Sequence, residues 1–367
     1  MHENLEADDH NAPALLQRSD GRWVAAYTRH KSDDLTRYRL SEPCDPTAWG
    51  TEQTFDWSPF TGGLGVTYSN LHVLDGRLVC FARAVNDDQC ALVSDDEGST
   101  WSYAGKLFTR SKVGYVNGYT RYASRGGRID LITTDHHPRD YDNSIYHGYL
   151  QHGALHRSDG SIIDALALNG AAPSQVELTT VLAAGERVGG EAMRHCWTGD
   201  IRLGADGSIV AILIARVDDP DDPAEAYERM RPVLDHRFLY AKLLPGGQWR
   251  VHQLSRAGAG LLPHEQDYTG LVAIDPDDVD RVVASTPIDP RDGTRLPHHE
   301  LFHGTTSDHG ASWRWVRITS ESTVDNLRPI VAPGDPDRMH LLWFRGEMHS
   351  SQRYRCEAVL RVYERTT

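Results

Sequence analysis

The sequence is poor in cysteine and lysine, and it has no long apolar run. Its five cysteines are dispersed without a C-x-x-C pair, which excludes a disulfide framework and a zinc ribbon. The longest apolar run, residues 209–215, is far too short to span a bilayer. Basic charge is also scarce, because 38 Lys and Arg stand against 52 Asp and Glu, a formal net charge of −14. We therefore expect neither a membrane protein nor a nucleic-acid binder.

A signal peptide is likewise missing from the start of the sequence. The first residues, MHENLEADDHNAP, are polar and acidic, without the basic and apolar regions that such a signal needs. The expected location is cytoplasmic, or secreted or periplasmic where an export signal has been removed.

What the sequence does contain is a series of short strand-like segments. Apolar, β-branched or aromatic stretches that each follow a Gly or Asp turn predict β-strands. They occupy residues 22–29, 77–83, 128–134, 208–216, 281–286 and 339–345. Few windows keep a helical period, so the pattern predicts an all-β sandwich, barrel or propeller.

A repeated motif narrows this choice. Residues 94–101, SDDEGSTW, have the form S-x-D-x-G-x-T-W, and residues 306–313, TSDHGASW, have the form T-x-D-x-G-x-S-W. This pattern is the Asp-box of sialidase-like β-propellers. Its Asp caps turn N–H groups, its Gly supplies a positive φ, and its Trp fills the space between neighbouring sheets. The motif indicates the fold and leaves the function open.

The chain then divides into four-stranded units. They lie at roughly residues 10–57, 64–108, 115–182, 195–255, 266–320 and 325–365. We predict a single β-propeller domain over residues 1–367. Seven blades are expected if a further blade lies in residues 156–195 or is completed by the termini, and six otherwise. The acidic run 218–222 is expected to be a solvated loop, followed by a short helix over residues 223–231.

Candidate site residues follow from blade geometry. A blade is an up-and-down meander, so the start of its innermost strand and the end of its second strand lie on one rim. Arg, His and Tyr dominate these positions, which predicts a cationic canyon for an acidic ligand. The candidates are Asn70, His72, Tyr119, Arg121, His136, His137, His147, Asp200, His236, Arg237, Tyr268 and Arg328.

Several stretches resemble the BNR-4 group of propeller proteins. They are GVTYSNLHVL, GRLVCFAR, YTRYAS, RIDLITTDHHPRDYDNSIYHGYLQHGALHRSDG, CWTGDIRL, DHRFLYAKL, YTGLVAID and NLRPIVAP. The group includes ulvan lyases and rhamnose–glucuronate lyases. The resemblance implies a propeller with a canyon, in which a His/Tyr pair acts on a uronate whose carboxylate is neutralised by Arg.

We therefore predict a polysaccharide lyase that cleaves a uronate-containing glycan of the rhamnose–glucuronate type by β-elimination. His72, Tyr119 and His137 form the predicted acid/base set, with Arg237 and Arg328 as carboxylate clamps. The remaining candidates are assigned to substrate binding.

Two other functions stay open. A glycoside hydrolase, rhamnosidase- or sialidase-like, would need two rim carboxylates, for which Asp135 and Asp200 are the candidates. The sialidase alternative ranks lower because the sequence has no Arg-Ile-Pro element. A non-catalytic carbohydrate-binding propeller would use the same Arg and aromatic residues.

The sequence also leads to expectations about the binding partner, the oligomeric state and the cofactor. The expected partner is an acidic oligo- or polysaccharide, and a monomer is expected. No cofactor is required, while a structural calcium or zinc ion stays open, with His136, His137 and His147 as an alternative ligand set.

Overall fold

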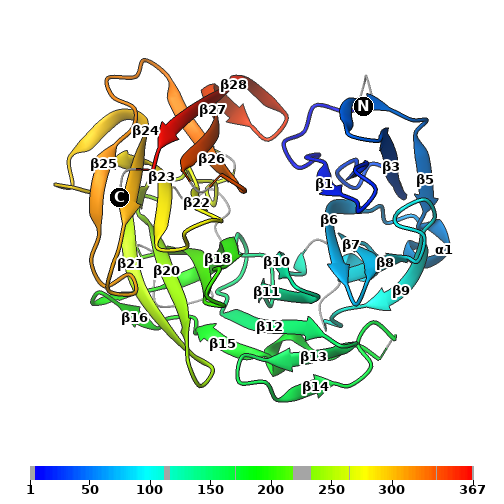
Figure 1. Ribbon diagram of the computed structural model, residues 1–367. Coiled ribbons are helices and arrows are strands. Elements are labelled where there is room, and N and C mark those ends of the chain that lie inside the picture. Colours follow the sequence, from blue (N-terminus) through cyan, green and yellow to red (C-terminus); the bar gives the residue numbers. More distant parts are fainter. Residues whose placement is uncertain are drawn as a thin grey trace. The chain divides into compact units, whose positions relative to one another are not determined.

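The computed structural model describes residues 5–110, 116–169, 171–217, 233–263, 265–335 and 337–365. Within these ranges almost all regular structure is β, which confirms the all-β prediction (Figure 1). The exceptions are a four-residue helix, α1 (Ser58–Thr61), and 3-10 turns at Val85–Asp87 and Gln175–Glu177. None of the described helices has the length and apolar character needed to cross a membrane. The predicted loop at 218–222 and helix at 223–231 lie outside the described residues.

The contacts divide the chain into two compact units. Unit 1 comprises residues 1–117, 124–130 and 148–178, and unit 2 comprises residues 118–123, 131–147 and 179–367. Each unit is described below by itself. The single domain over residues 1–367 stays a prediction.

Unit 1 contains two complete antiparallel sheets. The first has strands β1 (Ala14–Gln17), β2 (Trp23–Thr28), β3 (Leu35–Glu42), β4 (Asp45–Trp49) and β5 (Gln53–Asp56). The second has strands β6 (Thr67–Leu74), β7 (Arg77–Arg83), β8 (Gln89–Ser94) and β9 (Ser102–Lys106).

The third sheet contributes residues to both units. Its strands are β10 (Thr120–Arg125), β11 (Arg128–Thr134), β12 (Ile145–Gln151), β13 (Ala154–Arg157), β14 (Ile162–Asp164) and β15 (Thr179–Leu182). A small hairpin follows, made of β16 (Arg187–Val188) and β17 (Glu191–Ala192).

Unit 2 contains three further sheets. The fourth has strands β18 (Arg194–Leu203), β19 (Ile209–Arg216), β20 (His236–Leu244) and β21 (Gln248–Gly258). The fifth has strands β22 (Val272–Ile274), β23 (Arg281–Ile288), β24 (Arg295–Thr305) and β25 (Arg314–Arg317). The sixth has strands β26 (Asp325–Ala332), β27 (Arg338–Ser350) and β28 (Arg353–Glu364).

These six sheets are propeller blades, and they coincide with the six units predicted from the sequence. Six is the smaller of the two expected numbers. Residues 156–195 form no additional blade in the described part of the chain, because β13 to β15 belong to the third sheet and β16 and β17 make only a hairpin.

Burial explains why the apolar segments form the inner strands. All eight residues of β19, IVAILIAR, are buried, as expected for a strand covered on both faces. Its alternate side chains enter two different clusters, one containing Ile209, Ala211 and Leu213 and the other containing Val210 and Ile212. Because successive side chains of a strand point to opposite faces, this one strand contributes to two hydrophobic clusters.

The Asp-box turns have the predicted geometry. In the second sheet, Asp96 accepts hydrogen bonds from the backbone N–H of Thr100 at 2.8 Å and from its hydroxyl at 2.6 Å. Asp308 makes the equivalent bonds to Ser312 at 2.9 and 2.6 Å. These hydrogen bonds lower the pKa of each carboxyl to about 2. The following Trp313 packs edge-on against Tyr240 of the preceding sheet, with ring centroids 5.1 Å apart.

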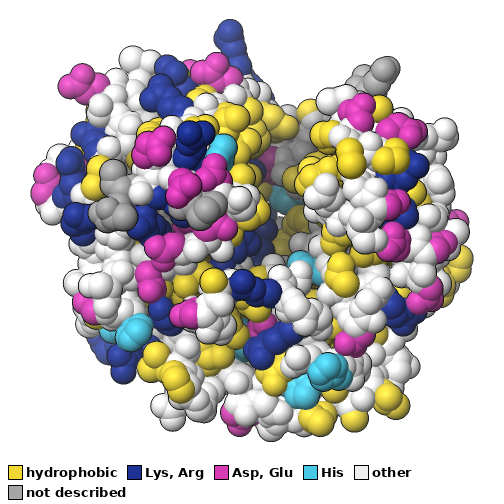
Figure 2. Space-filling view, in the orientation of Figure 1, with side chains coloured by type: hydrophobic (Ala, Val, Ile, Leu, Met, Phe, Trp, Pro, Cys, Tyr) yellow, Lys and Arg dark blue, Asp and Glu magenta, His cyan; other side chains and the backbone are white. Residues whose placement is uncertain are grey.

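The sixth sheet differs from the others. It has three strands, and one of its faces carries a row of exposed apolar side chains in cross-strand register, Ile330, Leu342 and Leu360. Within unit 2 this sheet therefore buries only one face. On the face of the molecule shown in Figure 2, positively and negatively charged side chains are interspersed.

The second Asp-box turn offers a test of the packing. Gly310 has φ +91°, and a Cβ there would lie 2.4 Å from Cδ1 of Tyr240. Gly310→Ala combines backbone strain with overpacking, and we expect it to lower the free energy of unfolding by about 2–4 kcal/mol. Urea unfolding followed by fluorescence measures the change.

The matched control is Gly293→Ala. Gly293 has φ +79° with no atom within 4 Å of the added Cβ, so only the backbone strain of about 1 kcal/mol remains. Equal losses for the two variants would show that contact with Tyr240 does not stabilise the turn.

Candidate functional site

Two histidines and a tyrosine meet in unit 1. His10 precedes β1, His30 follows β2, and Tyr68 is the second residue of β6. The imidazoles of His10 and His30 are stacked, with centroids 4.0 Å apart and planes inclined by 15°. The Tyr68 ring lies 6.0 Å from the first and 5.9 Å from the second. We call this group the His10–His30–Tyr68 cluster.

Two carboxylates hold one nitrogen of His10. Its Nδ1 lies 2.5 Å from Oδ1 of Asp8 and 3.0 Å from Oδ1 of Asp9. Because both partners are acceptors, the proton of a neutral ring is held on Nδ1 and the lone pair is left on Nε2.

The same three residues are the candidate metal ligands of the described chain. Ligand atoms of Asp8, Asp9 and His10 all lie within 4.8 Å of one another, and no other group of at least three His, Cys, Asp or Glu residues in the described ranges meets this criterion. Their oxygen and nitrogen donors suit a divalent cation. His136, His137 and His147 do not form such a group.

His30 has a contrasting environment. Its backbone N–H donates to Oε1 of Glu6 at 2.9 Å, and its Nδ1 lies 2.8 Å from the buried hydroxyl of Thr67. Burial lowers the pKa of His30 to about 4, with further lowering by the charges of His10 and Arg83. His30 is therefore neutral at physiological pH, beside an imidazole that is held by two carboxylates.

The backbone of Tyr68 is strained. Its φ is +63°, in the left-handed region that bulky residues rarely adopt, and the pairing of β6 with β7 is irregular between Thr67 and Asn70. Such strain costs on the order of 1–3 kcal/mol and is concentrated at functional sites. The irregular backbone places the phenol beside the two imidazoles.

A buried arginine adds positive charge. Arg83 ends β7, opposite Thr67 in the strand register, and is 3% exposed. Its Nη2 donates to the carbonyl of Asn117 at 2.7 Å and its Nε to the carbonyl of Asp87 at 3.2 Å. Its Nε also lies 3.9 Å from Oδ1 of Asp87, and its charge helps to lower the pKa of His30. The cluster thus combines a neutral imidazole, a carboxylate-held imidazole, a phenol and a guanidinium.

A second group lies in unit 2. The Tyr119 hydroxyl is 2.9 Å from Nε2 of His137, and Nδ1 of His137 accepts the backbone N–H of Arg139 at 3.1 Å. The Nδ1 contact fixes the tautomer of the neutral ring, so Nε2–H points at the phenol oxygen. His137 is 4% exposed, with both nitrogens engaged. It therefore positions Tyr119 and does not face solvent.

An ion pair supports this second group. Nε of Arg139 lies 2.8 Å from Oδ1 of Asp267, and Arg139 also lies 3.4 Å from Glu265. Burial alone would raise the pKa of Asp267, but the Arg139 guanidinium holds it below its ordinary value. Asp267 is therefore ionised, and the charge of Arg139 is neutralised.

The other predicted site residues of unit 1 lie along β6. Nδ1 of His72 is 2.9 Å from the hydroxyl of Ser124, and burial lowers the pKa of His72 to about 4. Asn70 is half-buried opposite Phe81.

The predicted residues of unit 2 are mostly engaged in the fold. His147 is fully buried against Trp249, and Asp200 accepts the backbone N–H groups of Ile201 and Ile274. Arg237 is 6% exposed and paired with Asp235.

Two further predicted residues make local contacts. His236 is buried at the carbonyl of Gly258, and burial lowers its pKa to about 4. The His136 ring is tilted against that of Tyr141, with ring centroids 4.9 Å apart.

The last predicted residues lie on strand edges and turns. The Arg328 guanidinium lies over the Tyr268 ring, 5.4 Å from its centroid, and Arg121 is exposed on β10. The catalytic and substrate-binding roles of these predicted residues stay predictions.

His10, His30 and Tyr68 are not among the site residues predicted from the sequence. The rim rule, applied to the end of β2, would have drawn attention to residues 29–31. Tyr68 precedes two residues that were selected, Asn70 and His72, but nothing in the sequence reveals its positive φ. His10 lies before the first predicted strand, so no strand pattern points to it.

The blade sheets and their Asp-box turns define a β-propeller protein. The family model described as "BNR repeat-containing family member" matches residues 1–257. The chain therefore belongs to this family, as the sequence resemblance predicted. No curated protein matches the chain.

Solved structures share the fold at low identity. An ulvan lyase bound to -[GlcA(1-4)Rha3S]- has a TM-score of 0.63 and 13% identity, over 97% of this chain and 79% of that one. The polysaccharide lyase Uly1 has a TM-score of 0.52 and 11% identity, over 97% and 78%. An α-L-arabinofuranosidase from Fusarium graminearum has a TM-score of 0.50 and 13% identity, over 96% and 92%.

The protonation state of His30 can be measured directly. NMR of histidine-labelled protein should show the His30 ring titrating near pH 4, where burial and the neighbouring charges place its pKa. His10→Gln should raise this pKa, because one positive neighbour is removed. An unchanged pKa would contradict coupling between the stacked rings.

The lowered pKa of His30 also makes the free energy of unfolding depend on pH. The folded-state pKa lies below the unfolded value of about 6.5, so the unfolded chain binds the proton more readily. The contribution of His30 to the free energy of unfolding is fully present above the unfolded-state pKa, and it is lost as pH falls towards 4. His30→Gln should therefore flatten the fall in unfolding free energy over this window.

Proposed function

We propose that this protein is a polysaccharide lyase that cleaves a uronate-containing glycan of the rhamnose–glucuronate type, with the His10–His30–Tyr68 cluster as its catalytic centre. The observation that carries the proposal is the contact of two imidazoles in unlike environments beside a strained tyrosine. Unlike environments in one pair of titratable groups are the usual basis for separate acid and base roles.

The chemistry requires three functions. The proton at C5 of a uronate is poorly acidic until the carboxylate charge is neutralised. The guanidinium of the buried Arg83, whose charge helps to lower the pKa of His30, supplies positive charge for this purpose. A base then removes the C5 proton, and an acid protonates the leaving oxygen at C4.

The roles follow from the environments of the side chains. His30, neutral at physiological pH, accepts the C5 proton, and the C–H electron pair forms the C4–C5 double bond. The C4–O bond breaks, and the Tyr68 hydroxyl donates its proton to the departing oxygen. Proton return from His30 to the tyrosinate restores the site, so no co-reactant is consumed.

The solved neighbours support the substrate class. The ulvan lyase is bound to a glucuronate–rhamnose sulfate oligosaccharide, which is the kind of glycan that the sequence resemblance implied. An acidic saccharide also suits the guanidinium of Arg83, whose charge acts on His30.

Hydrolysis fits the cluster less well, although the neighbours include an arabinofuranosidase. A glycosidase places two carboxyl groups on either side of the scissile bond, about 5–9.5 Å apart. The carboxylates of Asp8 and Asp9 both contact a single nitrogen of His10, so they are placed as supports for that ring.

The proposal is tested on ulvan, a gum arabic-type rhamnose–glucuronate glycan, and pectin. The unsaturated uronate product absorbs in the ultraviolet, and the absorbance rises only if elimination occurs. Tyr68→Phe should lower kcat/KM by about 10²–10⁴-fold, because it removes the proton donor and keeps the ring. Tyr354→Phe, on an exposed side chain of β28, is the matched control and should retain activity.

Two results would contradict the proposal. Chain cleavage without absorbance would indicate a hydrolase. Loss of activity in Tyr119→Phe, with Tyr68→Phe fully active, would move the catalytic centre to the Tyr119–His137 pair of unit 2.

A further inference from the structure

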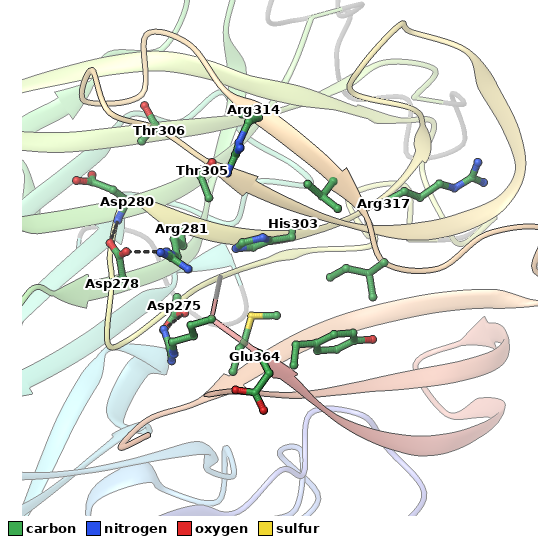
Figure 3. A pocket seen from close by; sticks show the side chains of 15 residues that line it. Asp275, Asp278, Asp280, Arg281, His303, Thr305, Thr306, Arg314, Arg317 and Glu364 are labelled. Carbon is green, nitrogen blue, oxygen red and sulfur yellow. Dashed lines mark hydrogen bonds and ion pairs between the residues drawn. The ribbon is translucent and has the colours of Figure 1, made fainter. Parts of the chain in front are cut away.

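A cavity of about 370 Å³ lies in unit 2. It is bordered by the fifth sheet, through β23, β24 and β25, and by the sixth sheet, through the start of β27 and the end of β28 (Figure 3). Its size is at the lower end of the range of small-molecule sites, which fits one or two sugar rings.

The cavity lies at the far end of the fifth sheet from the Tyr119–His137 pair. Asp267 pairs with Arg139, which contacts His137, and it precedes β22 in the chain. The cavity residue Asp275 follows β22. Strands are extended, so the two ends of a blade face opposite rims. No residue lining the cavity belongs to either candidate centre.

Most of its acidic groups are already neutralised. Asp278 pairs with Nε of Arg281 at 2.7 Å, as Figure 3 shows, and Asp275 pairs with Arg365. Asp280 accepts from Lys242 at 2.7 Å. These carboxylates therefore do not repel an anion as isolated charges would.

Most polar groups of the cavity that lack a partner among the described residues are hydrogen-bond donors. Among the described residues, no ion pair or hydrogen bond engages the guanidinium of Arg314, which lies on β25. Nε2 of His303 and the hydroxyl of Tyr363 are shielded from water without a hydrogen-bond partner in the described chain. Such unpaired buried polar atoms are costly and indicate a missing partner. In Figure 3 Arg314 and His303 lie on the same side of the cavity.

The remaining walls suit a sugar ring better than a bare inorganic anion. Met339 and Ile318 give an apolar surface that continues into the core of the fifth and sixth sheets. Glu364 offers carboxylate oxygens, because among the described residues its ion pairing is limited to a 3.5 Å contact with the exposed Arg338. Carboxylate oxygens accept hydrogen bonds from hydroxyl groups, and a sugar ring offers more of these than phosphate does at neutral pH.

We propose that this cavity is a second ligand site, which binds a sugar acid through Arg314, His303 and Tyr363. The guanidinium and imidazole take the sugar carboxylate, the Tyr363 hydroxyl and Glu364 take ring hydroxyls, and Met339 and Ile318 cover the apolar face of the ring. The proposed role of this site is binding. It does not depend on elimination at the His10–His30–Tyr68 cluster.

Calorimetric titration of the full chain with D-glucuronate tests the site, with D-glucose and inorganic phosphate as comparison ligands. We expect glucuronate to bind more tightly than either. Arg314→Gln should weaken glucuronate binding at least tenfold, because it removes a charge-assisted hydrogen bond, and Tyr363→Phe should weaken it severalfold. Arg250→Gln, an exposed arginine on β21, is the matched control and should bind like the parent.

The outcome is separable from that of the proposed function. Tyr68→Phe should leave this binding unchanged, whatever its effect on cleavage. Equal affinities for phosphate and glucuronate, or equal binding by the Arg314→Gln and Arg250→Gln variants, would overturn the proposal. Loss of binding only in Tyr68→Phe would show that glucuronate occupies the first cluster instead.

Discussion

The proposed chemistry depends on the stacking of His10 on His30. Two imidazoles in contact cannot both carry a proton cheaply, and their surroundings decide which one does. Asp8 and Asp9 contact one ring, while burial keeps the other neutral. The result is a neutral base, His30, beside an imidazole whose Nδ1 is held by two carboxylates, which a solvated pair of histidines would not provide.

The fold keeps this arrangement in place through backbone pairing. His30 follows β2 and contacts Thr67, which lies opposite Arg83 in the register of β6 and β7. One strand irregularity then turns Tyr68 towards the imidazoles. The strain at Tyr68 is small beside the many hydrogen bonds and buried residues of the two sheets that hold it.

Much of the fold could be predicted from the sequence, because its signals are local. Alternating apolar residues, Gly and Asp turns and two Asp boxes specify strands without reference to distant residues, and the six predicted units match six sheets. The blade number was less certain, because nothing local shows that residues 156–195 complete the third sheet. Strand partners depend on the whole sheet.

The candidate site was harder to predict for the same reason. Of the predicted acid/base set, Tyr119 and His137 lie in contact, since both lie at neighbouring strand ends of one sheet, and their catalytic role stays a prediction. His147 and Arg237 were selected as residues at strand starts on the expected rim, but burial and ion pairing take up their side chains. His10, His30 and Tyr68 meet only through tertiary structure and a positive φ, so no spacing in the sequence reveals them.

The central claim is that a proton leaves C5 of a uronate in the step that breaks the chain. The most direct measurement compares cleavage of a glucuronate–rhamnose glycan with that of its C5-deuterated form. The account predicts a primary isotope effect on kcat/KM together with an unsaturated product. Equal rates for the two substrates and a saturated product would contradict it.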